Sequence, residues 1–516
     1  MKPSTELFQL VKSLTKSEKR FFKLTSSLQS GEKNYIKIFD AIEKQTDYNE
    51  DEIKSLFSDE TFIKHFPSEK NHLYKLILKS LRAYHADNSA ASILKQEIKN
   101  IEVLFKKALF KECGKFLQRA KKIASDNEKF YYSIDLIDWE KILLEEAYEA
   151  GEFTRELDEL IAEEQWVIQC LNNLAEYQVL YSKINYIFRL GGFVKSDEEA
   201  AMVEEIAKNP LIMDSSLALS IRAKSICYYV RGFCCVAFRD IEGAIKNFEK
   251  AKEILESNQN ILNDLPNRYV RIINNLAQMY ISNKDYNKVE ELLELFDYLS
   301  SRPAFTSADV ANLIVFSKHT TRLLYYNRQG LYAEGVKQAE KTIKDFKDAD
   351  IQLSKEKEII FNYIVSYLYF GNAMYKDSLQ WINKVLNDNE NTLRQDIYSY
   401  ARIFNLIIHF ELGNYDLLEY IIKSTNRYLN KKNRDYAVET TLVDYIKKLS
   451  KQQNSEERKK LFGELNIDLE NIFNSPSDRV ILEYIDFRSW IFSKTEEKSF
   501  AEIVQQRGLP RRASAS

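Results

Sequence analysis

The sequence contains few residues that break helices. Its 516 residues include only 13 glycines and 7 prolines. No proline lies between Pro67 and Pro210, or between Pro303 and Pro476. This scarcity excludes collagen-like, low-complexity and turn-rich all-β chains. Long proline-free runs favour helices joined by short connections, so the sequence predicts an all-α protein.

Cysteine, signal sequences and an excess of charge of one sign are also lacking. The five cysteines form no CxxC pair, which predicts reduced, buried thiols in a cytoplasmic protein. The N-terminus has no apolar signal region. The longest uncharged run, residues 359–375, is too short and too polar to span a bilayer. Lys plus Arg number 74 against 77 Asp plus Glu, giving a net charge of −3. We therefore expect neither a membrane protein nor a general nucleic-acid coat.

Recognisable catalytic motifs are missing as well. The chain contains no GxxxxGK[ST], GxGxxG or GxSxG sequence. Its five histidines form neither HExxH nor another common zinc spacing. Adjacent carboxylates such as Glu145 and Glu146 are typical of a solvated helix face. The sequence therefore predicts no catalytic residue, no metal site and no cofactor. An enzyme whose site is assembled from distant helices stays open as a second alternative.

The most informative pattern that is present is an internal repeat. Within residues 228–255, Gly232, Ala244, Phe248 and Ala251 follow one another at intervals of 12, 4 and 3. The two small residues let a pair of helices approach closely, and Phe248 fills the space between them. Asp240 lies at the turn, where its side chain can cap the second helix. These residues resemble the small–small–aromatic–small positions of the tetratricopeptide repeat (TPR) family.

Weaker copies are predicted wherever an aromatic or apolar anchor opens the second helix of a pair. The anchors lie 40 to 48 residues apart, more than the roughly 34 residues of a simple TPR. They are Phe110, Phe153, Phe193, Ile241, Tyr286, Tyr332, Tyr375 and Tyr415. A hairpin cannot bury both of its apolar stripes alone, so neighbouring hairpins stack. The predicted fold class is an all-α, right-handed α-solenoid of about eight degenerate TPR-like helix hairpins, with helical N- and C-terminal caps.

The predicted domain boundaries follow from the limits of this repeat. Residues 1–90 form an N-terminal helical domain, 91–450 the TPR-like solenoid, 451–506 a C-terminal helical cap and 507–516 a disordered tail. Within the first domain, Thr15 and Glu18 have capping-box spacing, and Ser68 is the expected N-cap of its last helix. The expected helices are Thr5–Leu14, Ser17–Ser27, Asn34–Lys44, Glu50–Phe57 and Ser68–His85.

The last of these helices carries one basic face. Lys75, Lys79 and Arg82 occupy positions i, i+4 and i+7, where they would suit contacts with phosphates. A helix-turn-helix-like domain followed by TPRs resembles, in layout only, peptide-sensing bacterial transcription regulators. However, residues 1–85 hold 15 Lys or Arg against 12 Asp or Glu, and this small excess favours an ordinary solvated face. A DNA-binding regulator with a TPR sensor domain is therefore the alternative function, and nucleic acid the less favoured partner.

The resemblance to TPRs implies a non-catalytic scaffold or adaptor that binds a peptide segment or partner protein in a concave groove. In that family, side chains of the first helices line the groove. The corresponding residues are Tyr229, Phe233, Val236, Arg271, Asn274, Gln278, Thr320, Asn327, Tyr363, Tyr367 and Tyr400. Arg271, Asn274 and Gln278 follow one another on successive turns, so they suit a peptide backbone or carboxylate. The tyrosines offer contact area or belong to the core. The sequence identifies neither the partner nor the oligomeric state.

Overall fold

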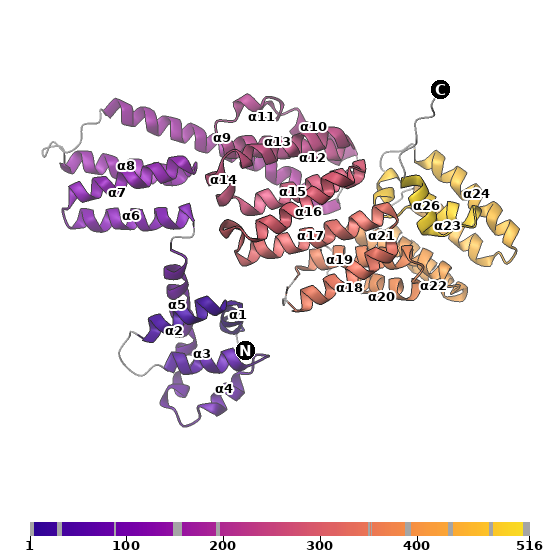
Figure 1. Ribbon diagram of the computed structural model, residues 1–516, viewed down its shortest axis with the longest axis horizontal. Coiled ribbons are helices and arrows are strands. Elements are labelled where there is room, and N and C mark those ends of the chain that lie inside the picture. Colours follow the sequence, from indigo (N-terminus) through magenta and orange to yellow (C-terminus); the bar gives the residue numbers. More distant parts are fainter. Residues whose placement is uncertain are drawn as a thin grey trace. The chain divides into compact units, whose positions relative to one another are not determined.

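A computed structural model describes residues 5–27, 34–86, 89–147, 157–191, 194, 197–348, 351, 353–387, 394–431, 437–473 and 478–508. Within these ranges the regular structure is helical, without a β-strand (Figure 1). No helix among them is long and apolar enough to cross a membrane. The chain divides into two compact units, Met1–Gln165 and Trp166–Ser516, which are described separately. The predicted domain boundaries stay predictions.

The first unit contains two separate hydrophobic clusters. One is formed by buried residues between Leu7 and Ile77, and the other by buried residues between Leu94 and Leu143. The helices of this unit are α1 (Glu6–Ser13), α2 (Lys16–Ser27), α3 (Asn34–Lys44), α4 (Glu50–Leu56), the 3₁₀ helix η1 (Thr61–His65), α5 (Phe66–Tyr84), α6 (Ala90–Lys106), α7 (Phe110–Asp126), α8 (Phe130–Ala147) and the start of α9 (Leu157–Gly191).

The predicted capping box before α2 is confirmed. The Thr15 N–H donates to Glu18 Oε2 at 2.7 Å, and the Glu18 N–H donates to Thr15 Oγ1 at 3.2 Å. The prediction that Ser68 caps α5 is wrong, because the helix already begins at Phe66. Pro67 fits the first turn since its missing N–H would have no helical partner there.

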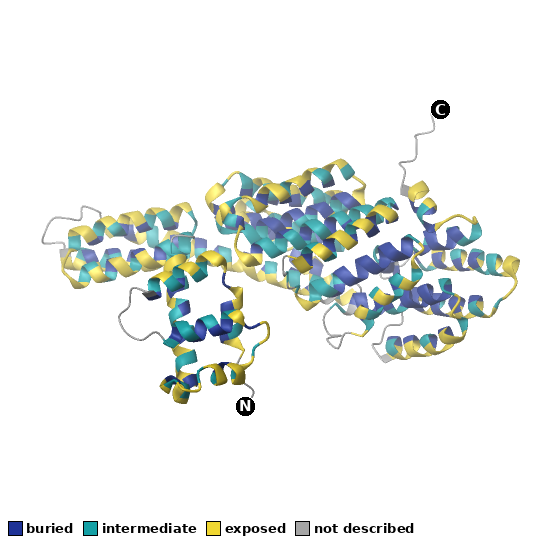
Figure 2. Cartoon of the chain, turned by 60° about the horizontal axis from the view of Figure 1, so that its bottom comes forward, coloured by how far each residue is buried: buried dark blue, intermediate teal, exposed yellow. Residues whose placement is uncertain are grey.

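The second unit is built from helix hairpins that stack in chain order. Its helices are α9, α10 (Asp197–Ala207), α11 (Pro210–Met213), η3 (Ser215–Leu217), α12 (Ile221–Ala237), α13 (Ile241–Glu256), α14 (Gln259–Asp264), α15 (Pro266–Asn283), α16 (Tyr286–Ser300), η4 (Pro303–Phe305), α17 (Ala308–Gln329), α18 (Tyr332–Asp348), α19 (Lys355–Gly371), α20 (Tyr375–Leu386), α21 (Gln395–Glu411), α22 (Tyr415–Lys431), α23 (Ala437–Lys451), α24 (Ser455–Ile472), η5 (Asp478–Glu483), α25 (Phe487–Thr495) and α26 (Phe500–Gly508). The first helices α15, α17, α19, α21 and α23 each contact the next. Figure 2 shows buried positions along the sides where these helices face their neighbours.

The anchors of the predicted repeat are the first residues of helices. This holds for Phe110, Ile241, Tyr286, Tyr332, Tyr375 and Tyr415, while Phe153 and Phe193 lie outside the described residues. Two positions before each of these six anchors, the chain adopts a left-handed conformation, at Ala108, Arg239, Lys284, Gly330, Ala373 and Gly413. The next N–H then bonds back five residues, as Asp285 does to the Tyr280 carbonyl at 2.9 Å. One Schellman-type turn therefore recurs through the array.

The packing predicted for the best repeat is confirmed. A Cβ added to Gly232 would lie 2.6 Å from Phe248 Cε1, so only glycine permits this approach of α12 to α13. Ala244, Phe248 and Ala251 are fully buried. The Asp240 carboxylate accepts the Gly243 N–H at 2.9 Å and caps α13. The fold is therefore an α-solenoid of TPR-like helix hairpins.

Candidate functional site

The residues predicted to line a groove lie on the first helices α12, α15, α17, α19 and α21. We call the surface formed by these positions the first-helix face. In the structure its two ends differ. The end on α19 and α21 is covered by the chain's own residues 478–508, whereas the α15 positions Arg271 and Gln278 are exposed.

At the covered end, the three predicted tyrosines belong to the core. Tyr363, Tyr367 and Tyr400 are between 2% and 6% exposed. The Tyr363 hydroxyl donates to the Tyr484 carbonyl at 3.2 Å, and the Tyr400 and Tyr484 rings lie 4.4 Å apart. Their burial gives no support to direct contact with a partner. It arises because a later segment of the same chain packs on them, which the repeat pattern alone does not show.

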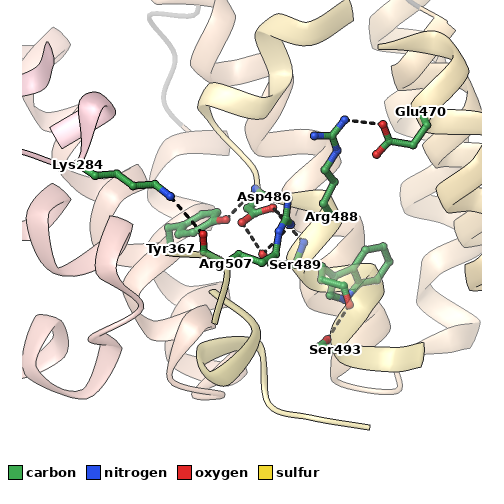
Figure 3. A network of polar contacts seen from close by, with 9 residues as sticks. Lys284, Tyr367, Glu470, Asp486, Arg488, Ser489, Ser493 and Arg507 are labelled. Atoms are coloured by element: carbon green, nitrogen blue, oxygen red, sulfur yellow. Dashed lines mark hydrogen bonds and ion pairs between the residues drawn. The ribbon is translucent and has the colours of Figure 1, made fainter. Parts of the chain in front are cut away.

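A polar network fixes this C-terminal segment in place (Figure 3). The Asp486 N–H donates to the Tyr367 hydroxyl at 2.9 Å, and its carboxylate caps α25 by accepting the Ser489 N–H at 3.0 Å. Arg507 of α26 reaches both residues, at 3.4 Å from Asp486 Oδ1 and 3.1 Å from Ser489 Oγ. The Lys284 ammonium donates to the Arg507 carbonyl at 3.2 Å. The end of α26 is therefore tied to the turn between α15 and α16.

A buried ion pair positions Tyr484 on the first-helix face. The Arg394 guanidinium donates to both oxygens of Asp396, at 3.0 and 2.7 Å, and Asp396 is fully buried. The Tyr484 hydroxyl donates to the same carboxylate at 2.5 Å. Burial, followed by the nearby Asp396 charge, raises the pKa of Tyr484 well above its usual value. The phenol stays protonated and serves as a fixed donor.

At the other end of the face, aromatic side chains form a base beneath the exposed polar groups. Tyr229 is 2% exposed, and its ring lies 5.2 Å from that of Tyr181 and 5.0 Å from that of Phe233. Asn275 Nδ2 donates to the Tyr229 hydroxyl at 3.4 Å. Tyr229 thus belongs to the packed layer, and Phe233 and Val236 are half-buried beside it.

The polar residues predicted on α15 are accessible. Arg271 and Gln278 are exposed, and Asn274 is half-buried. Arg271 Nη1 donates to the Tyr181 hydroxyl at 3.4 Å. The other two predicted positions lie on α17, where Thr320 is buried and donates to its own helix at the Phe316 carbonyl, and Asn327 is half-buried. Whether any of these residues contacts a partner stays a prediction.

Two further cations, which the repeat pattern did not select, lie beside Arg271. The Arg268 guanidinium lies over the Tyr181 ring at 5.4 Å from its centroid, and the Lys357 ammonium lies 5.1 Å from the centroid of Phe316. We call Arg268, Arg271 and Lys357 the cationic cluster. Among the described residues, no carboxylate forms an ion pair with any of its three members.

Burial and neighbouring positive charges lower the pKa values of two members of the cluster. Burial lowers the pKa of Arg268. Among the smaller effects, Tyr181 and Tyr229 raise this pKa, while the charges of Arg222 and Arg271 lower it. Burial also lowers the pKa of Lys357, with Arg271 adding to the effect and Glu356 opposing it. Arg222 differs from the cluster because Asp264 pairs with it. The cluster is therefore a partly desolvated site that an anion would stabilise.

The basic residues predicted on the N-terminal domain are also accessible. Lys75, Lys79 and Arg82 are exposed on α5, while Leu73 and Ile77 of the same helix are fully buried. In the described part of the chain, the three cations form no ion pair.

Chemistry-bearing groups elsewhere are engaged in structure. A cavity of about 420 Å³ is lined by residues of α13 to α16 that include Glu256 and Arg302. Glu256 there pairs with Lys252, and Arg302 donates to Gln259 and Asn263. Over the described ranges, no group of three or more His, Cys, Asp or Glu side chains could hold a metal ion.

No family model matches the sequence. No curated protein matches it either. Among solved structures, the chain is similar to the apo form of the quorum sensor NprR from B. thuringiensis, at 12% identity and a TM-score of 0.41. The match covers 76% of this chain and 99% of the other.

Proposed function

We propose that the protein is a non-catalytic cytoplasmic scaffold that holds a segment of a partner protein or a peptide on its first-helix face. The observation that carries the proposal is that one end of this face is covered by the chain itself, whereas the other end is exposed. One end already holds a segment of the same chain, residues 478–508, through aromatic contacts and hydrogen bonds. At the other end, Arg271 and Gln278 are exposed and Asn274 is half-buried, and Arg271 contacts Tyr181 of the packed Tyr181–Tyr229 pair.

The same physical features suit an external segment. Because the stacked helices form a rigid base, the scaffold loses little conformational entropy when it binds a segment. Amide and guanidinium groups on successive turns can satisfy the backbone and the acidic groups of an extended chain. The half-buried ring of Tyr181 beside Arg271 adds contact area at low entropic cost.

The proposal is tested by capture with a charge-reversed variant. We expect Arg271→Glu to lose most of a partner that the wild-type chain captures from its native cells, measured by quantitative mass spectrometry. Arg427→Glu is the matched control, because Arg427 is exposed on α22, a second helix. Circular dichroism and melting should be unchanged in both variants. Equal capture by the wild type and both variants would contradict the proposal.

A second candidate rests on the exposed, unpaired Lys75, Lys79 and Arg82 of α5. In a DNA-binding regulator these side chains would contact phosphates, so binding to duplex DNA would weaken steeply with salt. The triple alanine variant would then lose that binding and reduce the salt slope by about 3. Absence of binding to duplex DNA at low salt would exclude this candidate.

A further inference from the structure

The cationic cluster has features of a ligand site that structural packing alone does not explain. Its three positive groups come from two helices, α15 and α19, separated in the stack by α17. Arg268 and Arg271 both contact Tyr181, through the ring and the hydroxyl respectively. Arg268 and Arg271 thus meet at Tyr181, and Lys357 lies close enough to Arg271 for the arginine charge to lower the pKa of the ammonium. Repulsion between these like charges is costly.

Nearby acidic groups do not neutralise this charge. Asp264 pairs with Arg222, and Asp309 accepts a hydrogen bond from Asn267. Glu356 is the chain neighbour of Lys357, but it forms no ion pair with Lys357 in the described structure. By contrast, two other cations of this part of the chain are paired, Arg394 with Asp396 and Arg328 with Glu483.

We propose that Arg268, Arg271 and Lys357 form a subsite for two carboxylates of an acidic peptide segment, with both arginines positioned by contact with Tyr181. One exposed cation and two half-buried ones are more than a single carboxylate requires, so the ligand carries at least two negative charges. Arginine forks bind carboxylates in fixed geometry, while Lys357 contributes a more flexible point charge. The phenol of Tyr181 holds Arg271 in position before the ligand arrives.

The covered end of the same face offers an independent precedent for such a segment. There the chain's own segment with Glu483, Tyr484 and Asp486 packs on the face, and Glu483 Oε2 lies 3.4 Å from Arg328 Nη2. An acidic segment with an aromatic residue is therefore a kind of occupant that this face accepts. The inference deepens the proposed function, because it names the chemical class of the partner segment.

The test uses the full chain and a capped, fluorescently labelled hexaglutamate peptide, followed by fluorescence anisotropy at about 50 mM salt, where exposed charges are weakly screened. We expect saturable binding that an otherwise identical hexaglutamine peptide does not show. Arg268→Gln/Arg271→Gln/Lys357→Gln should weaken binding at least tenfold. The single variant Arg271→Gln, at an exposed position, should weaken it about three- to tenfold without any risk to folding.

A matched control removes three positive charges from the second helices of three hairpins. Lys246, Lys337 and Arg427 are exposed on α13, α18 and α22, and their triple glutamine variant should bind hexaglutamate as the wild type does. Equal weakening by both triple variants would overturn the inference, because it would show a general charge effect. Inorganic pyrophosphate is added as a competitor. Displacement of the peptide by pyrophosphate supports an anion subsite, whereas saturable pyrophosphate binding without hexaglutamate binding overturns the assignment to carboxylates.

Failure of this inference can be distinguished from failure of the proposed function. If the wild-type chain captures a partner through Arg271 but hexaglutamate does not bind, only the carboxylate assignment is overturned. If hexaglutamate binds at the cluster but no partner is captured through the face, the subsite stands and the scaffold function is contradicted.

Discussion

Arg268 illustrates how the surroundings of a single side chain can keep a charge buried at a cost in folding free energy. Its guanidinium lies over Tyr181 near two other arginines, and burial lowers its pKa. A desolvated cation without a carboxylate partner reduces the stability of the free protein. Such a cost is expected at a binding site, where the ligand later supplies the missing charge.

We therefore predict that Arg268→Met stabilises the free protein by up to about 1 kcal/mol, because it removes the charge while the thioether still packs on Tyr181. Thermal unfolding measures the effect. Arg427→Met, at an exposed position, should change stability by less than about 0.5 kcal/mol. A clear loss of stability in Arg268→Met would show that the cation is well compensated, contrary to this account.

Glu50 provides a pH-dependent contribution in the first unit. Burial raises its pKa, but hydrogen bonds from Lys54, Lys70 and Tyr48 lower it more strongly, to about 2. Because the folded pKa lies below the unfolded value of about 4.3, the stabilisation is present above that pH and is lost as pH falls towards 2. Glu50→Gln should therefore cost about 1 to 2 kcal/mol at pH 7, after allowance for solvent screening, and little near pH 2. Urea unfolding at the two pH values checks this, and a penalty independent of pH would contradict it.

At the scale of the helix hairpin, one close contact fixes the approach of α12 to α13. Gly232→Ala would place a Cβ 2.6 Å from the Phe248 ring, so we expect a loss of about 1 to 3 kcal/mol. Gly463 of α24 is the control, since a Cβ there meets nothing within 4 Å. Gly463→Ala should stabilise by about 0.5 to 1 kcal/mol through helix propensity. Combining Gly232→Ala with Phe248→Leu should cost less than the sum of the two changes, and simple additivity would contradict the contact.

The recurring turn makes a second prediction at this scale. Ala373 is exposed and adopts φ +57°, a conformation that glycine occupies without strain. Ala373→Gly should therefore raise the free energy of unfolding by about 1 kcal/mol. The same change at Ala201, exposed within α10, should lower it by about 1 kcal/mol. Denaturant unfolding measures the free energy of unfolding of both variants. A loss of stability in Ala373→Gly would be evidence against strain in this turn.

The helices were largely predictable from the sequence, whereas the turns between them were only partly so. Anchors such as Tyr375 and Tyr415 pack back on the preceding helix, against Phe370 and Phe410, whereas Tyr286 contacts Tyr325 of the following helix α17. Gly330 and Gly413 marked two turns, but Ala108, Lys284 and Ala373 adopt the same left-handed conformation without a glycine signal. Backbone hydrogen bonds that complete the turn outweigh the preference of these residues.

For the molecule as a whole, exposure could be predicted where it depends on the local repeat, and could not be predicted where it depends on contacts between residues distant in the sequence. The repeat placed Arg271 and Gln278 on a first helix, where both are exposed, and their contact with a partner stays a prediction. Tyr363 and Tyr400 could not be placed, because their burial depends on a segment more than eighty residues later in the chain. Arg268 and Lys357 escaped the pattern for a similar reason, since what distinguishes them is that no carboxylate among the described residues forms an ion pair with either.

The most direct test of the scaffold function is site-specific photocrosslinking in the native cells. A benzophenone amino acid at the exposed position Gln278 of α15 reports on the first-helix face, and the same amino acid at exposed Glu253 of α13 reports on a second helix. We predict discrete adducts to one or a few partners from position 278, lost when Arg271→Glu is added, and none of these adducts from position 253. No adduct from position 278, or the same adducts from both positions, would contradict the account.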